Sequence, residues 1–305
     1  MLVGFLILSQ CENLQKDLES KSIVKVCGAY DSMSAKLVEL YGFDAVWAGS
    51  FAISATHNVP DASILTMTEF FTAASNMAHA CEIPVIADCD TGYGDATNVR
   101  YMVKKYENAG IAGICIEDKT FPKQNSLLKN GNNQLLSEKD FVAKILAANE
   151  AKQNKSFSII ARVEALISGI GMDEALKRAY AYEKAGADLI LIHSKKISPE
   201  EIFEFSESWK GSSPLVAIPT TYYSVKMDEL ISHNIKMVIY ANQTLRAAHK
   251  ALTNLLTKMK DANNMDKIQN EMSSMDEIFK LQEMFDIKSQ EKDIEEKLRK
   301  LGYIT

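Results

Sequence analysis

Short apolar runs that alternate with helical stretches constrain the fold of this chain more than any other feature. Eight runs rich in Val, Ile and Leu recur, at residues 23–30, 44–50, 84–90, 113–118, 158–165, 189–194, 215–220 and 237–242. Runs that are apolar on both faces are typical of strands in a parallel sheet covered on both sides. Because no GxGxxG turn follows the first run, the repeat predicts an α/β fold of the (β/α)₈ TIM-barrel type and not an open doubly wound sheet.

The stretches between the runs carry recognisable helix ends. Asp95 is a candidate N-cap for a helix that ends at Gly110. A second helix is expected to begin near Asp173 and to end at Gly186.

The C-terminal residues, 261–305, are charged and Met-rich. Their apolar residues recur at helical spacing, at Met272, Met275, Ile278, Leu281 and Met284. No linker or low-complexity segment divides the chain. We therefore expect a single barrel domain, 1–305, in which 261–305 form a helical extension.

Composition excludes several classes of protein. Hydrophobic residues make up 47% and charged residues 24%, which are globular values. The net charge of −6 argues against nucleic acid or an anionic membrane as partner, and no run approaches the roughly 18 apolar residues of a membrane span. The five cysteines are scattered without a CxxC pair, and no basic residue precedes the apolar N-terminal run. These features predict reduced thiols and a cytoplasmic location.

Acidic residues follow neighbouring predicted strands, where a barrel carries its active site. Asp88 and Asp90 close the third run, and because they are two apart on a strand they are expected to point to the same side. Glu117 closes the fourth run and can join them. All-oxygen ligands favour a hard ion such as Mg²⁺, so the sequence predicts a magnesium site. The alternative is that these acids merely cap the following helices.

Three cations, Lys123, Arg162 and His193, are expected around the acidic cluster. A buried arginine is costly unless it is paired or faces an anion, and the alternative for Arg162 is an ion pair with Glu164. The alternative for His193 is a hydrogen-bonded core histidine. A metal flanked by Arg, Lys and His suits a small substrate that bears carboxylate and phosphate-like groups. The polar loop 119–131 is a candidate lid that excludes water, with a solvated connection as the alternative.

Six motifs together resemble the phosphoenolpyruvate mutase/isocitrate lyase superfamily. The resemblance covers residues 23–282 and rests on Trp47-Ala48-Gly49-Ser50, Val59-Pro60-Asp61, Asp88-Cys89-Asp90-Thr91-Gly92-Tyr93-Gly94, the segment EDKTFPKQNS from Glu117 to Ser126, Ala161-Arg162-Val163-Glu164-Ala165 and His193-Ser194-Lys195-Lys196. It implies a Mg²⁺-bearing barrel enzyme that acts on a small anionic substrate. It also implies C-terminal helices swapped between paired subunits and a homotetramer built as a dimer of such dimers.

The resemblance also implies roles for individual residues. Asp88 would bind the metal directly, and Asp61, Asp90 and Glu117 would act through metal-bound water, with Asp61 in the place of the family's active-site aspartate. The substrate carboxylate would lie at the backbone of Gly49 and Ser50, with Trp47 and Phe51 beside it. The phosphoryl and carbonyl oxygens would be held by Arg162 and His193. The gating loop would supply Lys123, Asn125 and Ser126.

The loop separates the branches of this superfamily. Lyases of isocitrate and methylisocitrate carry a Lys-Lys-Cys-Gly-His-type loop, whereas this chain has EDKTFPKQNS. Mutases have Asn at the position of Asn125 and hydrolases usually have Thr. The resemblance therefore implies an isomerase that moves a phosphoryl group between the enol oxygen of phosphoenolpyruvate and C3 of phosphonopyruvate. A phosphonopyruvate hydrolase, a carbon–carbon lyase of a 2-hydroxy or 2-methyl diacid, and a non-catalytic ligand-binding barrel are the alternatives.

Overall fold

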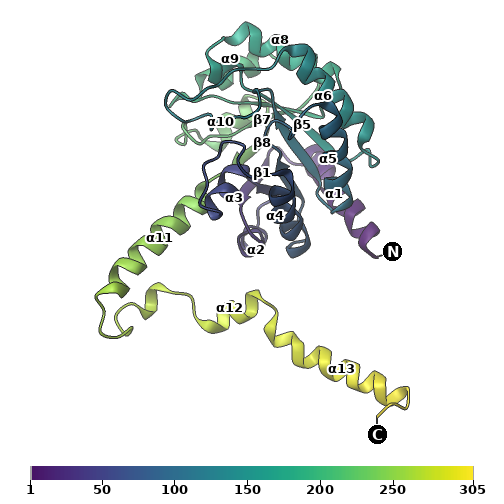
Figure 1. Ribbon diagram of the computed structural model, residues 1–305, viewed down its shortest axis with the longest axis vertical. Coiled ribbons are helices and arrows are strands. Elements are labelled where there is room, and N and C mark those ends of the chain that lie inside the picture. Colours follow the sequence, from purple (N-terminus) through teal and green to yellow (C-terminus); the bar gives the residue numbers. More distant parts are fainter. Residues whose placement is uncertain (1, 305) are drawn as a thin grey trace. The chain divides into compact units, whose positions relative to one another are not determined.

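Eight parallel strands close into a barrel in the computed structural model, which describes residues 2–304 and the side chains of residues 10–304 (Figure 1). The strands pair in chain order, and the first pairs with the last, which confirms the predicted (β/α)₈ barrel. They are β1 (Val24–Ala29), β2 (Ala45–Ala48), β3 (Val85–Asp88), β4 (Gly113–Glu117), β5 (Ser158–Val163), β6 (Leu189–Ile192), β7 (Leu215–Ala217) and β8 (Ile235–Tyr240).

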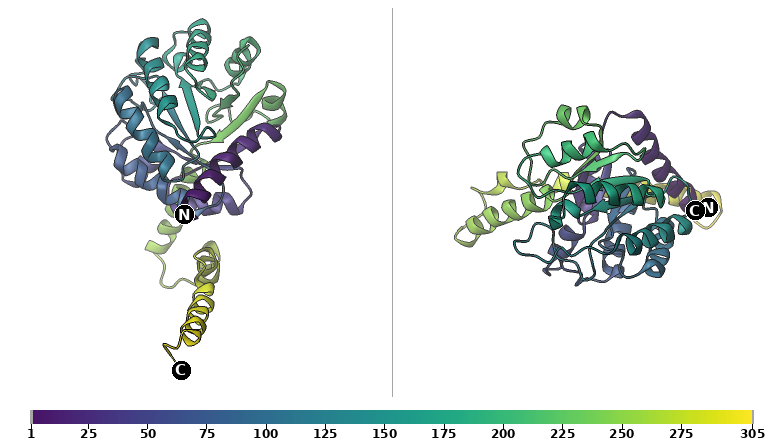
Figure 2. Two further views of the ribbon diagram at one scale, coloured as in Figure 1. Left: turned by 90° about the vertical axis from the view of Figure 1, so that its right-hand side faces the viewer. Right: turned by 90° about the horizontal axis from the view of Figure 1, so that it is seen from above.

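Helices surround the strands on the outside of the barrel (Figures 1 and 2). Those up to the last strand are α1 (Leu2–Ser20), α2 (Ser32–Leu40), α3 (Ser50–Thr56), α4 (Met67–Ala80), α5 (Ala96–Asn108), α6 (Glu138–Ala151), α7 (Ala165–Ser168), α8 (Met172–Lys184), α9 (Glu200–Ser208) and α10 (Met227–Ser232). Both faces of the strands are therefore covered, as the doubly apolar runs predicted.

Local signals explain where the helices begin. The Asp95 side chain accepts hydrogen bonds from the amides of Thr97 and Asn98, so it caps α5 as predicted. Helix α8 begins one residue before the expected Asp173, after Gly171, whose φ of 108° is strained for other residues. Asp173 lies in the first turn, where its charge favours the helix dipole.

Helix α1 covers the end of the barrel opposite the carboxyl ends of the strands. Its Gln10 amide donates to the Ala78 and Cys81 carbonyls before β3, and its Gln15 amide donates to Ser158, the first residue of β5. This leaves the other end of the barrel open for a site. All five cysteines are buried and free, in agreement with the prediction of reduced thiols.

The chain divides into two compact units, Met1–Arg246 and Ala247–Thr305. The second contains most of α11 (Gln243–Lys260), then η1 (Gln269–Glu271), α12 (Met275–Leu281), η2 (Met284–Asp286) and α13 (Ile287–Lys300). The helical spacing expected from Met272 to Met284 holds only within α12, because Ser274 caps a new helix and Glu283 takes a left-handed conformation. Among the described residues, no helix is both long and apolar enough to cross a membrane.

Candidate active site

A cavity of about 460 Å³ lies at the carboxyl ends of the strands. It is lined by eleven of the thirteen residues expected at the site, namely Trp47, Gly49, Ser50, Phe51, Asp61, Asp88, Lys123, Asn125, Ser126, Arg162 and His193. The other two, Asp90 and Glu117, are buried beside it and contact its lining residues. The volume is at the lower end of the range for small-molecule sites and suits a compact ligand.

The β2–α3 turn forms one wall of the cavity. Trp47 is buried at the end of β2, and Gly49 precedes α3. A Cβ on Gly49 would lie 3.0 Å from the Trp47 ring, so a side chain there would press on that wall. The Ser50 hydroxyl donates to Oδ2 of Asp88 at 3.0 Å, which ties this turn to β3.

Asp88 and Asp90 meet, but not by strand alternation as the sequence analysis assumed. Strand β3 ends at Asp88, and Asp90 lies beyond it with a left-handed φ of 50°. This turn lets the Asp90 amide donate to Oδ1 of Asp88 at 3.2 Å. The two carboxylates are therefore neighbours because the chain turns after the strand, and not because they share a strand face.

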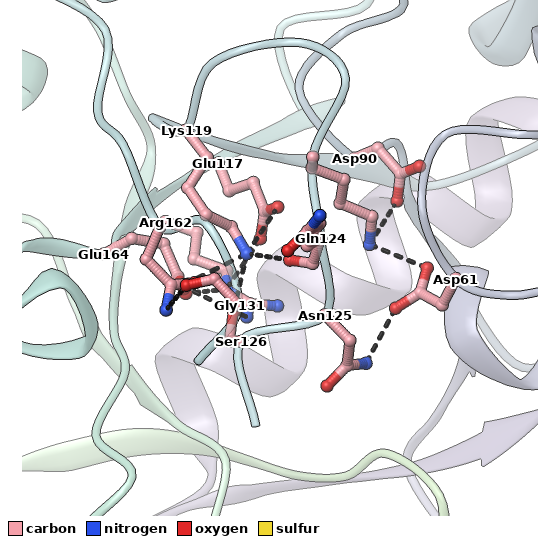
Figure 3. A network of polar contacts seen from close by, with 12 residues as sticks. Asp61, Asp90, Glu117, Lys119, Gln124, Asn125, Ser126, Gly131, Arg162 and Glu164 are labelled. Atoms are coloured by element: carbon pink, nitrogen blue, oxygen red, sulfur yellow. Dashed lines mark hydrogen bonds and ion pairs between the residues drawn. The ribbon is translucent and has the colours of Figure 1, made fainter. Parts of the chain in front are cut away.

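Lys123 lies between the carboxylates of Asp61 and Asp90, which are labelled in Figure 3, and so stands beside the acidic cluster as the sequence predicted. Its Nζ is 2.9 Å from Oδ1 of Asp61 and 2.8 Å from Oδ1 of Asp90. Burial alone would raise the pKa of Asp61, but the Lys123 ammonium and a hydrogen bond from Asn125 hold it below the usual range. Burial, reinforced by Asp88 and Asp61 against the effect of Lys123, raises the pKa of Asp90 to about 7.

The donor set suits a hard cation, although the acidic side chains are not gathered around one point. Within the described residues, no three His, Cys, Asp or Glu side chains converge closely enough to hold a metal ion. Oδ1 of Asp61, Oδ1 of Asp90 and Oε1 of Glu117 are nevertheless buried, and in the described part of the chain each is paired with a single lysine ammonium group, at 2.9, 2.8 and 3.4 Å respectively. Buried carboxylate oxygens with unused lone pairs fit the ligand preference of Mg²⁺.

Arg162 and His193 face the cavity and share Glu164 as a partner (Figure 3 shows Arg162 and Glu164). Nε of Arg162 donates to Oε1 of Glu164 at 2.6 Å, and Nδ1 of His193 is 2.7 Å from the same oxygen. The ion pair with Glu164, which was the alternative for Arg162, is therefore present. Nη2 of Arg162 nevertheless also donates to the Ser126 hydroxyl at 3.1 Å. Burial, followed by the nearby Arg162 charge, lowers the pKa of His193, so the ring is neutral near pH 7.

The 119–131 loop reaches over the cavity with polar side chains. Nδ2 of Asn125 donates to Oδ2 of Asp61 at 2.7 Å, and the Ser126 hydroxyl donates to Oε2 of Glu164 at 2.6 Å. Lys119, at the base of the loop, donates to the Gln124 carbonyl at 2.6 Å and to the Ser126 hydroxyl at 2.8 Å (Figure 3). The loop is therefore held down by its contacts to Asp61 and Glu164 and by Lys119 at its own base, and is not a solvated connection.

Sequence reasoning assigned no role to several residues of the site. Lys119 is only 1% exposed and holds the loop through its hydrogen bonds. The sequence feature that could have identified it is its position two residues after Glu117, at the end of a predicted strand. Asn242 and Arg246 line the cavity after β8; Asn242 was visible as a polar strand end, whereas Arg246 gave no signal. The apolar members Leu127, Leu128 and Ile218 could not be told from ordinary surface or core residues.

Comparison with known proteins identifies the family. A family model described as phosphoenolpyruvate phosphomutase matches residues 14–260. The chain is 39% identical to a phosphoenolpyruvate phosphomutase of Tetrahymena pyriformis, over 92% of this chain and 93% of that protein. It is 40% identical to a phosphonopyruvate hydrolase of Variovorax sp. (strain Pal2), over 90% of this chain and 95% of that protein.

A solved structure agrees with these matches. The crystal structure of a phosphoenolpyruvate phosphomutase from Streptomyces platensis subsp. rosaceus superposes with a TM-score of 0.91 at 42% identity, over 93% of this chain and 98% of that one. The resemblance inferred from the motifs and the expectation of an enzyme are confirmed. The chain belongs to the phosphoenolpyruvate phosphomutase family.

Proposed function

We propose that this enzyme is a phosphoenolpyruvate mutase, which interconverts phosphoenolpyruvate and phosphonopyruvate by intramolecular phosphoryl transfer. The observation that carries the proposal is the Asn125 side chain, whose amide donates to Oδ2 of Asp61 across the cavity. The resemblance associates Asn at this position with mutases and Thr with hydrolases. A threonine is too short to make the same contact, and would leave space for water beside Asp61.

Arg162 and His193 are proposed to hold the transferring phosphoryl group. A loose, metaphosphate-like transition state requires positioning and charge stabilisation more than a protein base. The Arg162 guanidinium is kept charged by Glu164 and Glu117, which raise its pKa against the effect of burial. Its fixed fork can then pair with phosphoryl oxygens while Glu164 keeps it in place.

The carboxylate end of the substrate is proposed to bind at the backbone of Gly49 and Ser50, with Trp47 and Phe51 as the neighbouring wall. All four residues line the cavity, and Gly49 lets the chain approach a ligand closely. This wall and Arg162 line the same cavity, so a single small dianion or trianion can contact both.

We propose Mg²⁺ as the metal, held by Asp88 directly and by Asp61, Asp90 and Glu117 through water. The buried carboxylate oxygens of Asp61, Asp90 and Glu117, each paired with one lysine ammonium group and so left with a free lone pair, support this choice. When bound, the ion would supply positive charge that stabilises the substrate oxygens. The loop side chains Lys123, Asn125 and Ser126 would close the cavity and exclude water, whose entry would give hydrolysis.

³¹P NMR of the purified enzyme with phosphonopyruvate and Mg²⁺ tests the proposal. Conversion to phosphoenolpyruvate is expected. Inorganic phosphate with equimolar pyruvate as the sole products would refute the mutase and identify a phosphonopyruvate hydrolase. The hydrolase is the second candidate because the Variovorax relative, at 40% identity, is as similar as the mutase relative at 39%.

We further propose a homotetramer made of helix-swapped dimers, in the cytoplasm. The second compact unit supports a partner, because α11, α12 and α13 have no buried residue and α11 exposes Leu252, Leu256 and Met259 at helical spacing. Light scattering on the purified protein measures the number of subunits.

A further inference from the structure

The two ends of the 119–131 loop pair with each other at its base. This base is hydrogen-bonded to a buried polar cluster, Asp118, Arg178 and Tyr182, that the proposed reaction does not use. Lys119 pairs with Leu135 in an antiparallel bridge, and the Thr120 amide donates to the Gln134 carbonyl at 2.9 Å. The Leu136 amide donates to the Asp118 carbonyl at 2.8 Å. We call this short ladder, residues 118–120 with 134–136, the neck of the loop.

Helix α8 holds the neck through two side chains one turn apart. Nη2 of Arg178 donates to the Leu136 carbonyl at 3.0 Å, and its Nη1 donates to Oδ2 of Asp118 at 3.1 Å. The Tyr182 hydroxyl donates to the same Asp118 oxygen at 2.6 Å and accepts from Arg178 at 3.1 Å. One guanidinium therefore bridges both strands of the neck, with its planar fork fixed by Tyr182.

Asp118 also reaches the catalytic side of the barrel. Its Oδ1 accepts from the backbone amide of Glu164 at 2.9 Å. The Glu164 carboxylate is the group that meets Arg162, His193 and the Ser126 hydroxyl of the loop tip. A single fully buried carboxylate thus fixes the base of the loop and the backbone of the residue on which its tip lands.

We propose that Asp118, Arg178 and Tyr182 are positioning residues that set the register in which the loop closes over the site. The neck stays fixed to α8 while the tip, which carries Lys123, Asn125 and Ser126, makes and breaks its contacts. Because the tip lands on Glu164, a loosened neck displaces Ser126 and Asn125 and admits water. This inference rests on the proposed function for its chemical consequence, and on geometry alone for the anchoring.

Tyr182→Phe removes one hydroxyl from the cluster, and Arg178→Lys keeps the charge but loses the fork. Tyr180→Phe is the matched control, because Tyr180 lies two residues away on α8 and its hydroxyl accepts from the Lys210 amide instead. Hydrogen exchange of peptides covering 119–137 is measured in the three variants and the parent. About tenfold faster exchange is expected for Tyr182→Phe and Arg178→Lys, the factor given by one lost hydrogen bond to a charged group. Peptides of β6 serve as the internal reference and should exchange unchanged.

The product ratio separates positioning from mere structural support. ³¹P NMR with phosphonopyruvate should show a larger share of inorganic phosphate for Tyr182→Phe and Arg178→Lys than for the parent and Tyr180→Phe. Unchanged exchange in both cluster variants overturns the anchoring, and faster exchange with an unchanged product ratio overturns the positioning role. A parent enzyme that forms no phosphoenolpyruvate refutes the proposed function instead, and the anchoring is then decided by exchange alone.

Discussion

Replacing Asn125 by alanine removes the contact between the loop tip and Asp61. The lost hydrogen bond, from Nδ2 to Oδ2 at 2.7 Å, has a charged acceptor, and such bonds contribute about 1.5–3 kcal/mol. If that contact is made only when the loop is closed, its loss lowers the closed population by about 10- to 150-fold. Since chemistry is proposed to need the closed loop, kcat/KM for phosphonopyruvate should fall by a similar factor.

A coupled assay for phosphoenolpyruvate, run beside a colorimetric assay for phosphate, measures both products of the Asn125→Ala enzyme. Phosphate should rise as a share of product, because the space left by the amide admits water beside the reacting group. Asn132→Ala is the control: Asn132 lies directly after the loop, and its side chain accepts from the Gln134 amide and not from a group of the cavity. A loss below about threefold for Asn125→Ala, smaller than any single charged hydrogen bond accounts for, would refute the reasoning.

Three further changes test other parts of the molecule. Asp88→Ala should abolish Mg²⁺-dependent turnover and remove the Mg²⁺ binding measured by calorimetry. The circular dichroism spectrum should stay unchanged, and retained Mg²⁺ binding would contradict the metal assignment. The double change Leu252→Gln and Leu256→Gln should lower the mass measured by light scattering, and an unaltered mass would place the subunit contacts elsewhere. Glu183 accepts from the amides of Ser212 and Ser213, and although burial opposes it, these bonds hold its pKa below the ordinary 4.5. The ionised Glu183 therefore stabilises the folded state above pH 4.5, and this contribution is lost as pH falls below that value. The difference in urea unfolding midpoint between Glu183→Gln and the parent should accordingly narrow on acidification.

The barrel could be predicted from the sequence because its strands carry a local signal. Seven of the eight strands fall within the expected apolar runs, and β8 begins two residues before its run, since each strand must be apolar on both faces to lie between the barrel interior and the helices. Groups on the strands or at their ends, such as Asp88, Arg162 and His193, could be placed at the site by the same logic. Their position follows from the strand to which they belong.

Groups supplied by loops could not be placed in this way. The turn that brings Asp90 beside Asp88 depends on a left-handed residue that no local signal marked. Lys123 reaches Asp61 and Asp90 from a loop whose neck pairs Thr120 with Gln134, a contact across fourteen residues with no apolar pattern. At the C-terminus the sequence predicted too much regular structure. The helical spacing from Met272 to Met284 continues through Ser274, where the chain in fact begins a new helix.

The charge balance of the site bears on which cation it can take. Five buried or cavity-lining carboxylates, Asp61, Asp88, Asp90, Glu117 and Glu164, face four cations, Lys119, Lys123, Arg162 and Arg246. His193 adds no charge when its ring is neutral. The carboxylates therefore carry at most one charge more than the cations, and the raised pKa of Asp90, about 7, makes this excess smaller still. The proposed divalent cation would leave the site with net positive charge, so the substrate anion could bind against the combined charge of the metal, Arg162 and Lys123. The acidic strand ends would thus be compatible with an anionic substrate, because the proposed divalent ion would stand between the two.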